Sequence, residues 1–452
     1  MFAARKCLEE APGLRVVMLD KGKPVSTRCS PRHCRDGREE AVNRVSGAGG
    51  AGLFSDGKLV LTLRAGGKLD GVFAQEERAN QYLRYVERVL TAYDGYSVRK
   101  DKPASQWQVY ADAMAQRGIT YKHLPVRHMG SENLRAVVGR FFHDLLRRKL
   151  ETGFEHEVTS IKREKDCFRV RFSDGTGRRN SLLARNVLLA PGKEGSRASW
   201  FTSFLAWHGI KSQPNRTYIG VRVETKPSEL MTEYSLDPKF YWHYDDGSKM
   251  KTHCYCRHGH VSSLRYYRLP LAGGHSPYTE ANEEKPDTLH ANFSILLGDT
   301  PNARYAWKDS VGIMRRVRMH SGGGLLVQRY GDFLRGRATT PERLSKNSIK
   351  PTDSTATPGN IAQLGLPNGF NAKLVDFVGR LSNVDPALVS DDTLLYAPAI
   401  EWWMPRVDAD ENLQTRVDGA YVAGDGAGFS QGIVYAAATG IRAAESILRS
   451  LP

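Results

Sequence analysis

The stretch HCYCRHGH, residues 253–260, concentrates side chains that could bind a metal or act as nucleophiles. Its Cys254, Cys256, His258 and His260 alternate, so an extended strand would turn all four to one face. A strand alone cannot wrap its ligands around a tetrahedral zinc ion, and a disulfide between residues two apart lies at the limit of the allowed Cα separation. Three interpretations stay open: a strand facing a ligand pocket, buried structural thiols, and, ranked last, a metal site. We expect no bound metal.

A glycine-rich stretch, GAGGAGLFSDGKL, spans residues 47–59. Four glycines in six positions let the backbone pass close to a ligand and expose consecutive N–H groups, which suits a phosphate or the edge of a flat ring. A flexible loop between two strands is the alternative interpretation.

An acid stands between glycines near the end of the chain, in AYVAGDGAGFSQGIVYAAATGIRAAESIL. The pattern predicts a short strand ending at Ala423, a turn through Asp425, and a long helix from Gln431 or Gly432. Ligands of open α/β sheets bind at the carboxyl ends of strands, and a carboxylate there suits a sugar-like hydroxyl. The helix N-terminus offers free N–H groups and a positive dipole end. An ordinary strand–turn–helix would explain the small residues but not the acid.

The elements expected to position these groups lie far apart in the sequence. Residues 1–10 predict a helix, and residues 14–19 a buried strand that ends at Asp20, which together form the second half of a dinucleotide-binding βαβ unit. An amphipathic helix from about Leu134, two alternating strands and an apolar strand at 187–190 follow. We expect a further strand and a glycine turn, roughly a dozen residues, to belong before Met1.

These motifs together resemble one group of bacterial FAD-dependent dehydrogenases, also called NAD(P)/FAD-dependent oxidoreductases, within the glutathione-reductase-like flavoproteins. The resemblance covers nearly the whole chain and continues through RHMGSENL, LLAPGKEGS, YIGVRVE, HCYCRHGHV, AGGHSPY, HANFSILL, QRYGDFLRGR and YAPAIEWWMPRVDADENLQTRVDG. In the family the chain enters through a strand and a glycine turn followed by a segment like MFAA, so the resemblance implies that this sequence is N-terminally truncated.

The resemblance implies a set of FAD-binding residues. Asp20, with Lys21 beside it, would hold the adenosine ribose, Val158 would line the adenine site, and Asp425 would bind the ribityl chain. The remaining residues would approach the pyrophosphate and the flavin: Gly49, Gly50, Ala51, Gly52, Phe54, Ser55, Gly57, Lys58, Ala190, Gly192, Gly424, Gln431, Gly432, Ile433 and Val434.

The expected fold is α/β: a split Rossmann-like FAD-binding domain of the glutathione-reductase type, its first strand missing, with an inserted α+β substrate domain. The FAD-binding domain would comprise residues 1–204, with a helical insertion at about 70–125, and residues 396–452. The substrate domain would comprise residues 205–395.

The function implied is an FAD-dependent oxidoreductase, a dehydrogenase or reductase of an unidentified small molecule. No second complete dinucleotide fingerprint is present, so NAD(P)H would visit the flavin only transiently. The alternatives are a flavin monooxygenase and a flavin-binding RNA-modifying protein. Cys254, Cys256, His128 and His275 are the candidate catalytic residues. Each histidine is a proton donor or a structural loop residue, and Ser131 is the expected N-cap of a helix from about Asn133.

Composition narrows the partners. The 452 residues carry a formal charge of +16, but the basic residues are dispersed and no nucleic-acid-binding signature accompanies them. An anionic cofactor or substrate suffices to explain the charge, and we expect no nucleic-acid partner. Six cysteines are sparse for this length, and Cys29 and Cys34 have no second pair nearby. With no apolar run of about 20 residues, the chain is expected in the cytoplasm without a membrane partner.

Overall fold

The computed structural model describes residues 1–28, 45–63, 65, 72–73, 75–94, 104–228, 236–276, 288–298, 307–367 and 369–451. Cys29, Cys34 and part of the expected helical insertion lie outside these ranges. The chain divides into two compact units. The first unit comprises Met1–Ser97, Glu132–Asn215 and Trp403–Pro452, and the second comprises Val98–Ser131 and Arg216–Trp402. The domain limits expected from the sequence stay a prediction.

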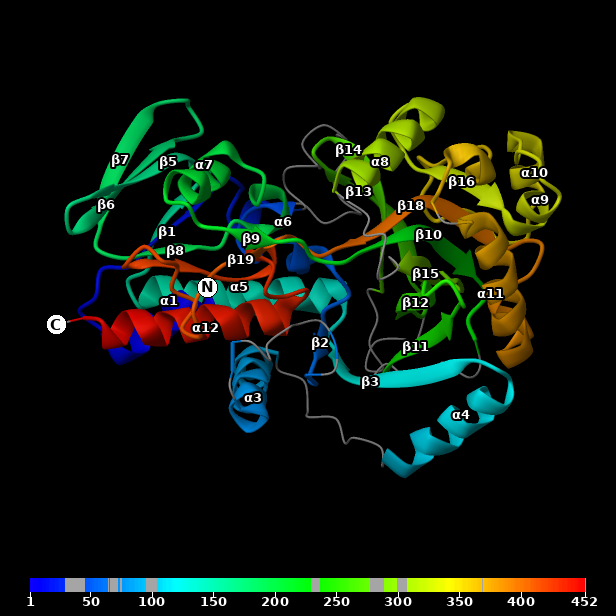
Figure 1. Ribbon diagram of the computed structural model, residues 1–452, viewed down its shortest axis with the longest axis horizontal. Helices are drawn as coiled ribbons and strands as arrows, with labels where there is room; N and C mark the ends of the chain where they lie inside the picture. Colours follow the sequence, from blue (N-terminus) through cyan, green and yellow to red (C-terminus); the bar gives the residue numbers. More distant parts are fainter. Residues whose placement is uncertain are drawn as a thin grey trace. The chain divides into compact units, whose positions relative to one another are not determined.

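The first unit contains long helices and short parallel strands (Figure 1). Its helices are α1 (Phe2–Glu10), α3 (Glu76–Ala92), α5 (Ser131–Arg147, whose first residue belongs to the second unit), α6 (Gly192–Gly195), α7 (Ser199–Trp207) and α12 (Ile433–Arg449). Its 3-10 turns are η1 (Val25–Thr27), η2 (Ala51–Phe54) and η6 (Asp425–Ala427). Its strands are β1 (Val17–Asp20), β2 (Lys58–Val60), β4 (Glu151–Phe154), β5 (Glu157–Glu164), β6 (Cys167–Ser173), β7 (Arg179–Ala184), β8 (Val187–Leu189), β9 (Ser212–Gln213), β19 (Arg406–Val407) and β20 (Ala420–Val422). The helix and strand expected at the start of the chain are α1 and β1, and the long C-terminal helix is α12.

Strand pairing in the first unit differs from one continuous Rossmann sheet. Strand β1 pairs in parallel with β4, and β20 pairs in parallel with β8, but these are two separate two-stranded sheets. Strands β5, β6 and β7 form a separate antiparallel sheet. The parallel pairs are of the expected kind, whereas a single sheet joining them is absent among the described residues. Helix α1 packs on α12, where Gly440 leaves room for Ala3.

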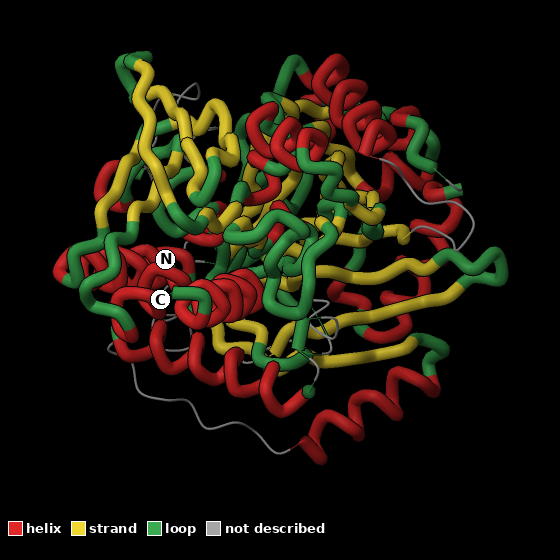
Figure 2. The backbone as a smooth tube through the Cα atoms, turned by 60° about the vertical axis from the view of Figure 1, so that its left-hand side comes forward, coloured by secondary structure: helices red, strands yellow, loops and turns green. Residues whose placement is uncertain are grey.

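The second unit is built on a large mixed sheet whose strands run side by side (Figure 2). Its strands are ordered β17 (Thr357–Pro358), β16 (Leu326–Arg329), β18 (Leu394–Trp402), β10 (Thr217–Thr225), β15 (Ala291–Gly298), β12 (Lys249–Cys256), β11 (Leu236–His243) and β3 (Thr120–His128). A hairpin, β13 (His260–Tyr266) with β14 (Leu269–His275), is separate from it. The helices are α4 (Ala104–Gln116), α8 (Trp307–Ser321), α9 (Tyr330–Leu334), α10 (Pro341–Ser345) and α11 (Phe370–Val384), and the 3-10 turns are η4 (Ile361–Leu364) and η5 (Pro386–Leu388). Strand β16 ends at Arg329, and α9 begins at the next residue, Tyr330.

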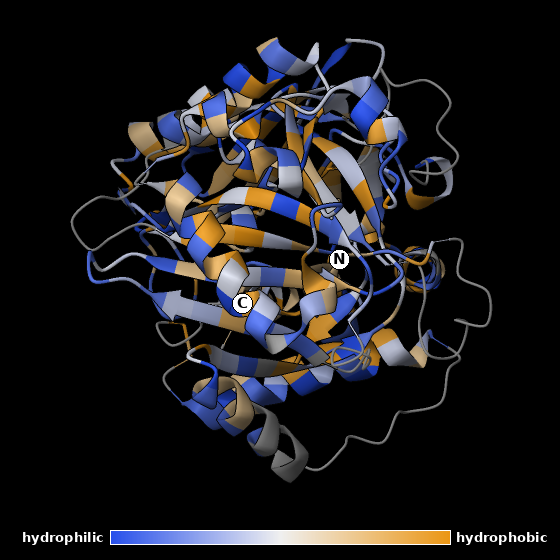
Figure 3. Cartoon of the chain, turned by 90° about the vertical axis from the view of Figure 1, so that its right-hand side faces the viewer, coloured by the Kyte–Doolittle hydropathy of each residue, from blue (hydrophilic) through white to orange (hydrophobic). Residues whose placement is uncertain are grey.

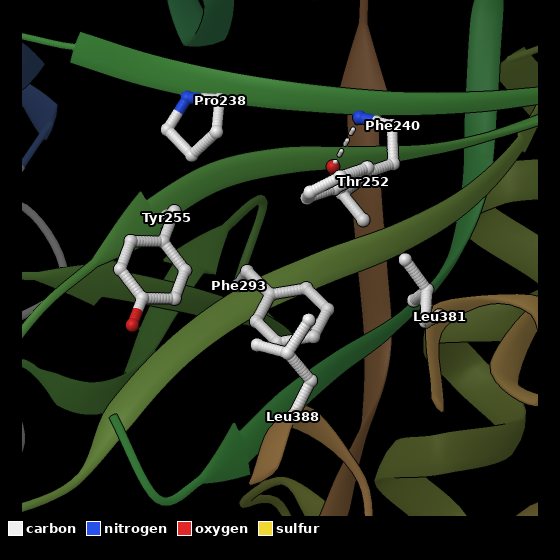
Figure 4. A pocket seen from close by; sticks show the side chains of 7 residues that line it. All are labelled: Pro238, Phe240, Thr252, Tyr255, Phe293, Leu381 and Leu388. Carbon is white, nitrogen blue, oxygen red and sulfur yellow. Dashed lines mark hydrogen bonds between the residues drawn. The ribbon is translucent and has the colours of Figure 1, made fainter. Parts of the chain in front are cut away.

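Side chains alternate along each strand of this sheet, and its central strands are buried on both faces. One face is apolar, whereas the other, called the polar face below, mixes charged residues such as Arg222 and Lys251 with a second apolar cluster around Leu296. The hydropathy of its strands can be followed in Figure 3. The apolar face includes Val221, Phe240 and Ile295, and it packs against α11, whose buried residues recur at helical spacing. A small apolar pocket lies in this core (Figure 4). Its polar atoms at Thr252 and Tyr255 accept hydrogen bonds from the backbone, so we interpret the pocket as a packing defect of the core rather than a ligand site.

Candidate functional site

The glycine loop of the first unit is held at its start by Asp20. The Oδ1 atom of this carboxylate accepts hydrogen bonds of 2.8 Å from the N–H groups of both Gly22 and Gly47. A side chain at Gly22 would place its Cβ 2.4 Å from the Gly47 nitrogen, so only glycine allows this approach. Oδ2 accepts no hydrogen bond from the described residues, and it remains available to a ligand hydroxyl.

Arg28 organises the same loop, although nothing in its sequence neighbourhood marked it. Its side chain is completely buried, and its guanidinium donates to the carbonyl oxygens of Ala48 at 2.5 Å and Gly50 at 2.9 Å. It also lies 4.9 Å above the ring of Phe54. Burial lowers the pKa of Arg28 to about 10, which leaves it charged at neutral pH.

The two bonds from Arg28 determine where the neighbouring N–H groups point. In a trans peptide the C=O and N–H groups point in opposite directions. With the Ala48 and Gly50 carbonyls turned toward Arg28, the N–H groups of Gly49 and Ala51 turn away from it. Neither N–H donates a hydrogen bond within the described part of the chain. These two free donors stand on either side of Gly50, whose own N–H bonds to the Gly47 carbonyl, and both are suited to an anion.

The second expected motif forms around the turn after β20. Gly424 has φ of 76°, and its N–H donates to the Thr439 hydroxyl at 3.0 Å, which ties the turn to α12. The Ser430 hydroxyl donates to Asp425 Oδ1 at 2.6 Å. Burial raises the pKa of Asp425, opposed by the charge of Lys193 and by hydrogen bonds from the Ser430 hydroxyl and the Gly432 backbone. Helix α12 then begins after Gly432, where φ is 128°.

The turn after β8 lies against the turn after β20. Because β8 and β20 are parallel neighbours, their carboxyl ends meet at one edge. An added Cβ at Gly426 would lie 2.2 Å from the Gly192 carbonyl oxygen, so the two backbones touch. Gly192 itself has φ of 66° and open space where a Cβ would be, and Ala190 is exposed.

These separate segments converge within the first unit. An added Cβ at Gly52 would lie 2.9 Å from the Ile433 side chain, and the Tyr435 hydroxyl donates to the Thr62 carbonyl at 2.5 Å, so the glycine loop and the segment after it meet the start of α12. The Lys21 ammonium lies 3.1 Å from the Glu194 carboxylate, which joins the end of β1 to α6.

Val158 lies on β5, the strand whose beginning adjoins the end of β1. The His156 N–H donates to the Asp20 carbonyl at 2.9 Å, and half-buried Val158 faces Phe172 across the β5–β6 pair. Lys58 forms a buried ion pair of 3.1 Å with Asp56. Ser55 donates to the Gly52 carbonyl at 2.7 Å and accepts from the Gly57 N–H, which shapes the end of the loop.

The expectation that Cys254, Cys256, His258 and His260 share one strand face is wrong. Strand β12 ends at Cys256, and Cys254 and His258 have φ of 55° and 46°, in the left-handed region. His258 is buried beside the Thr288 carbonyl, and His260 begins β13, where its ring stacks on His275 at 5.8 Å. The alternating letters could not reveal this, because the chain turns between the two strands.

The other sequence-derived candidates also lie in the second unit. His128 ends β3, and His275 ends β14 and is buried. Ser131 begins α5 rather than preceding it, and its hydroxyl donates to the Ser276 carbonyl at 3.3 Å, so the expected N-cap is wrong. This bond brings the residues after β3 close to those after β14.

The polar face of the second unit carries lysines that sequence reasoning did not single out. Lys251 is buried, its ammonium 2.5 Å from the Glu401 carboxylate and 3.8 Å from the centre of the Tyr218 ring. Lys249 is half-buried and lies 5.2 Å from the Tyr241 ring centre, with no acidic side chain at ion-pair distance among the described residues. Burial and the neighbouring positive charges lower the pKa of Lys249. Lys249 and Lys251 are two residues apart, and this spacing, which places both on one face of a strand, was the signal available in the sequence.

Comparisons with known proteins return structural likeness alone. No family model and no curated protein matches the sequence. AlpK is 14% identical over 98% of this chain, with a TM-score of 0.35. E. coli quinol fumarate reductase FrdA is 12% identical over 100% of this chain and 69% of its own, with a TM-score of 0.39. Aklavinone-11 hydroxylase, solved with FAD and aklavinone, is 12% identical over 99% of this chain, with a TM-score of 0.38.

The chain spans only 58% of the length of AlpK and of aklavinone-11 hydroxylase. At these identities and TM-scores, the likenesses carry no weight in assigning an activity to this chain. Among the described helices, none combines the length and hydrophobicity that crossing a membrane requires.

Proposed function

We propose that this chain is an FAD-dependent oxidoreductase, a dehydrogenase or reductase, whose cofactor binds in the first unit. The observation that carries the proposal is the direction of the Gly49 and Ala51 N–H groups. Arg28 turns them away from itself, and they lie in a loop that also meets the start of α12. Free N–H groups of this kind suit the phosphate groups of a dinucleotide.

The rest of the arrangement fits the same cofactor. Asp20 Oδ2 is available for a ribose hydroxyl, and Val158 on the adjacent strand would line the adenine. Asp425 would accept a ribityl hydroxyl, and the N-terminus of α12 would face the electron-rich part of the flavin ring. FAD, when bound, would supply two-electron redox chemistry that no amino-acid side chain provides. The protein residues would bind and orient it.

We further propose that the small-molecule substrate carries an aromatic ring and a carboxylate. On the polar face of the second unit, Lys249 has no acidic side chain at ion-pair distance within the described residues, whereas the nearby Lys251 is paired with Glu401. A buried or half-buried cation without a counter-ion favours an anionic ligand. Tyr241 is half-buried beside Lys249 and offers the flat surface of its ring to an aromatic ligand.

The first experiment titrates the purified chain with FAD and follows flavin fluorescence. Saturable one-to-one binding supports the proposal, and absence of binding by folded protein contradicts it. Loaded protein is then mixed with NADH, NADPH and candidate aromatic carboxylates under anaerobic conditions, and bleaching of the flavin absorbance identifies the reductant. Admission of oxygen distinguishes the reactions. A stoichiometric hydroxylated product would establish the monooxygenase alternative, whereas peroxide alone fits a dehydrogenase or reductase.

A further inference from the structure

The two sulfurs of Cys254 and Cys256 lie 3.9 Å apart in the second unit. A regular strand would hold side chains two residues apart at a greater distance. Here β12 pairs His253 with Ser294 and then Cys256 with Asn292, so the strand advances three residues while its partner advances two. The extra residue is a β-bulge, and Cys254 takes a φ of 55° within it. The bulge therefore turns both thiols toward each other.

A buried arginine lies against this pair. Arg222 on β10 is 3% exposed, and its Nη2 atom donates to the Cys254 carbonyl at 3.1 Å and to Cys256 Sγ at 3.3 Å. Its Nε atom donates to Asn292 Oδ1 at 2.8 Å, and its Nη1 atom to the Ser294 hydroxyl at 3.3 Å. These are neutral acceptors, apart from the thiol when it ionises.

Arg222 has no carboxylate at ion-pair distance among the described residues. The nearby Glu224 carboxylate is engaged by the hydroxyls of Thr352 and Tyr396. A buried guanidinium without a counter-ion is costly, and the ionisable group at its nitrogen is Cys256. Arg222 therefore favours the thiolate form of Cys256, the form that attacks disulfides.

Two glycines make this contact possible. An added Cβ at Gly274 would lie 2.1 Å from both Arg222 Nη2 and Asn292 Oδ1. An added Cβ at Gly259 would lie 2.7 Å from the Cβ of Cys256. Any other residue at either position would push the arginine or the cysteine away. The packing around the pair is thus built from backbone and side chains together.

We propose that Cys254 and Cys256 form a thiol–disulfide exchange site for small-molecule disulfides. The half-exposed Cys254 thiolate attacks one sulfur of the substrate, forming a mixed disulfide and releasing one thiolate of the substrate. The 1%-exposed Cys256 thiolate then attacks Cys254 Sγ, forming the intrachain disulfide and releasing the second thiolate. The two cysteines lose two electrons and two protons overall, and one disulfide becomes two thiols. The site lies within the second unit and does not rest on the proposed FAD function.

The test incubates the full chain with glutathione disulfide, blocks remaining thiols by alkylation and maps peptides by mass spectrometry. The expected product is a peptide that carries both cysteines, unalkylated and lighter by two hydrogen atoms. C256S should instead retain glutathione on Cys254, because the resolving thiol is missing. Cys7 and Cys167 are internal controls, and burial raises the pKa of Cys7 to about 11, so it should not react. Alkylation of both Cys254 and Cys256 after prolonged incubation would overturn the proposal.

The role of Arg222 is tested by N292D. This nearly isosteric change gives Arg222 a carboxylate counter-ion where it now binds the amide oxygen, so the thiolate is no longer needed to balance its charge. The rate of disulfide formation should fall severalfold, because a smaller fraction of Cys256 is then present as the thiolate that attacks Cys254. In R222M, provided that the variant folds, the rate of disulfide formation should fall at least as far. A wild-type rate in folded N292D would overturn the assignment of Arg222.

Discussion

Replacing Arg28 with methionine should weaken FAD binding, although Arg28 is not proposed to contact the cofactor. The substitution keeps most of the side-chain volume but removes both hydrogen bonds to the glycine loop. The carbonyls of Ala48 and Gly50 would then be free to rotate, and with them the N–H groups of Gly49 and Ala51. Losing two oriented donors, each worth about 1–1.5 kcal/mol, removes roughly 2–3 kcal/mol of binding. This corresponds to a dissociation constant roughly 30–150 times larger.

The same substitution should also lower the free energy of unfolding. Two hydrogen bonds from a charged donor contribute about 1.5–3 kcal/mol each, and the contact with the Phe54 ring about 0.5–1 kcal/mol. Relief from burying a charge opposes these losses, so we expect a net loss of about 2–4 kcal/mol. This is tolerable against a total of about 5–15 kcal/mol.

Urea unfolding and fluorescence titration with FAD measure the two quantities separately. The matched control is R84M, because Arg84 is exposed and, among the residues that the structure describes, pairs only with the exposed Glu77 on α3. That surface pair should be worth less than about 1 kcal/mol, with no effect on FAD. Unchanged FAD affinity in folded R28M would refute the argument that Arg28 orients the phosphate-binding N–H groups.

Three further outcomes are expected. D425N should reduce FAD occupancy more than C254A does, yet it should raise the stability of the FAD-free protein at pH 7, because burial raises the pKa of Asp425 and disfavours its charge. The difference in stability between D425N and wild type, measured by unfolding, should be smaller at pH 4 than at pH 7. K249M should weaken binding of benzoate about tenfold, as measured by isothermal calorimetry, while K162M at an exposed site should not. Equal benzoate affinities of K249M and wild type would exclude Lys249 from an anion site. Burial and the charge of Lys239 lower the pKa of His253 to about 3, so the unfolded chain binds the extra proton between pH 6.5 and 3, and stability should fall across that window less steeply in H253Q than in wild type.

The sequence by itself determined the elements whose signals are local. Helix α12 and the turn before it follow from a short apolar strand, an acid between glycines and a run of helix-forming residues, all adjacent in the chain. Strand β1 and helix α1 follow in the same way. The glycine loop could be located for the same reason, since its conformational freedom comes from its own glycine residues. FAD as the proposed cofactor comes from these local motifs and their resemblance to a known family.

Only the tertiary structure decided which distant residues complete the sites. Arg28 acts on the glycine loop through contacts made after the chain folds back, so no local pattern marks it. The face of Cys254 and Cys256 was mispredicted because the bulge depends on how β12 pairs with β15, and pairing register is not encoded within the eight residues of HCYCRHGH. Arg222 lies 34 positions before Cys256 and meets it only because β10 and β12 flank β15. Strand pairing sets such contacts, and it depends on long-range packing rather than on neighbours in sequence.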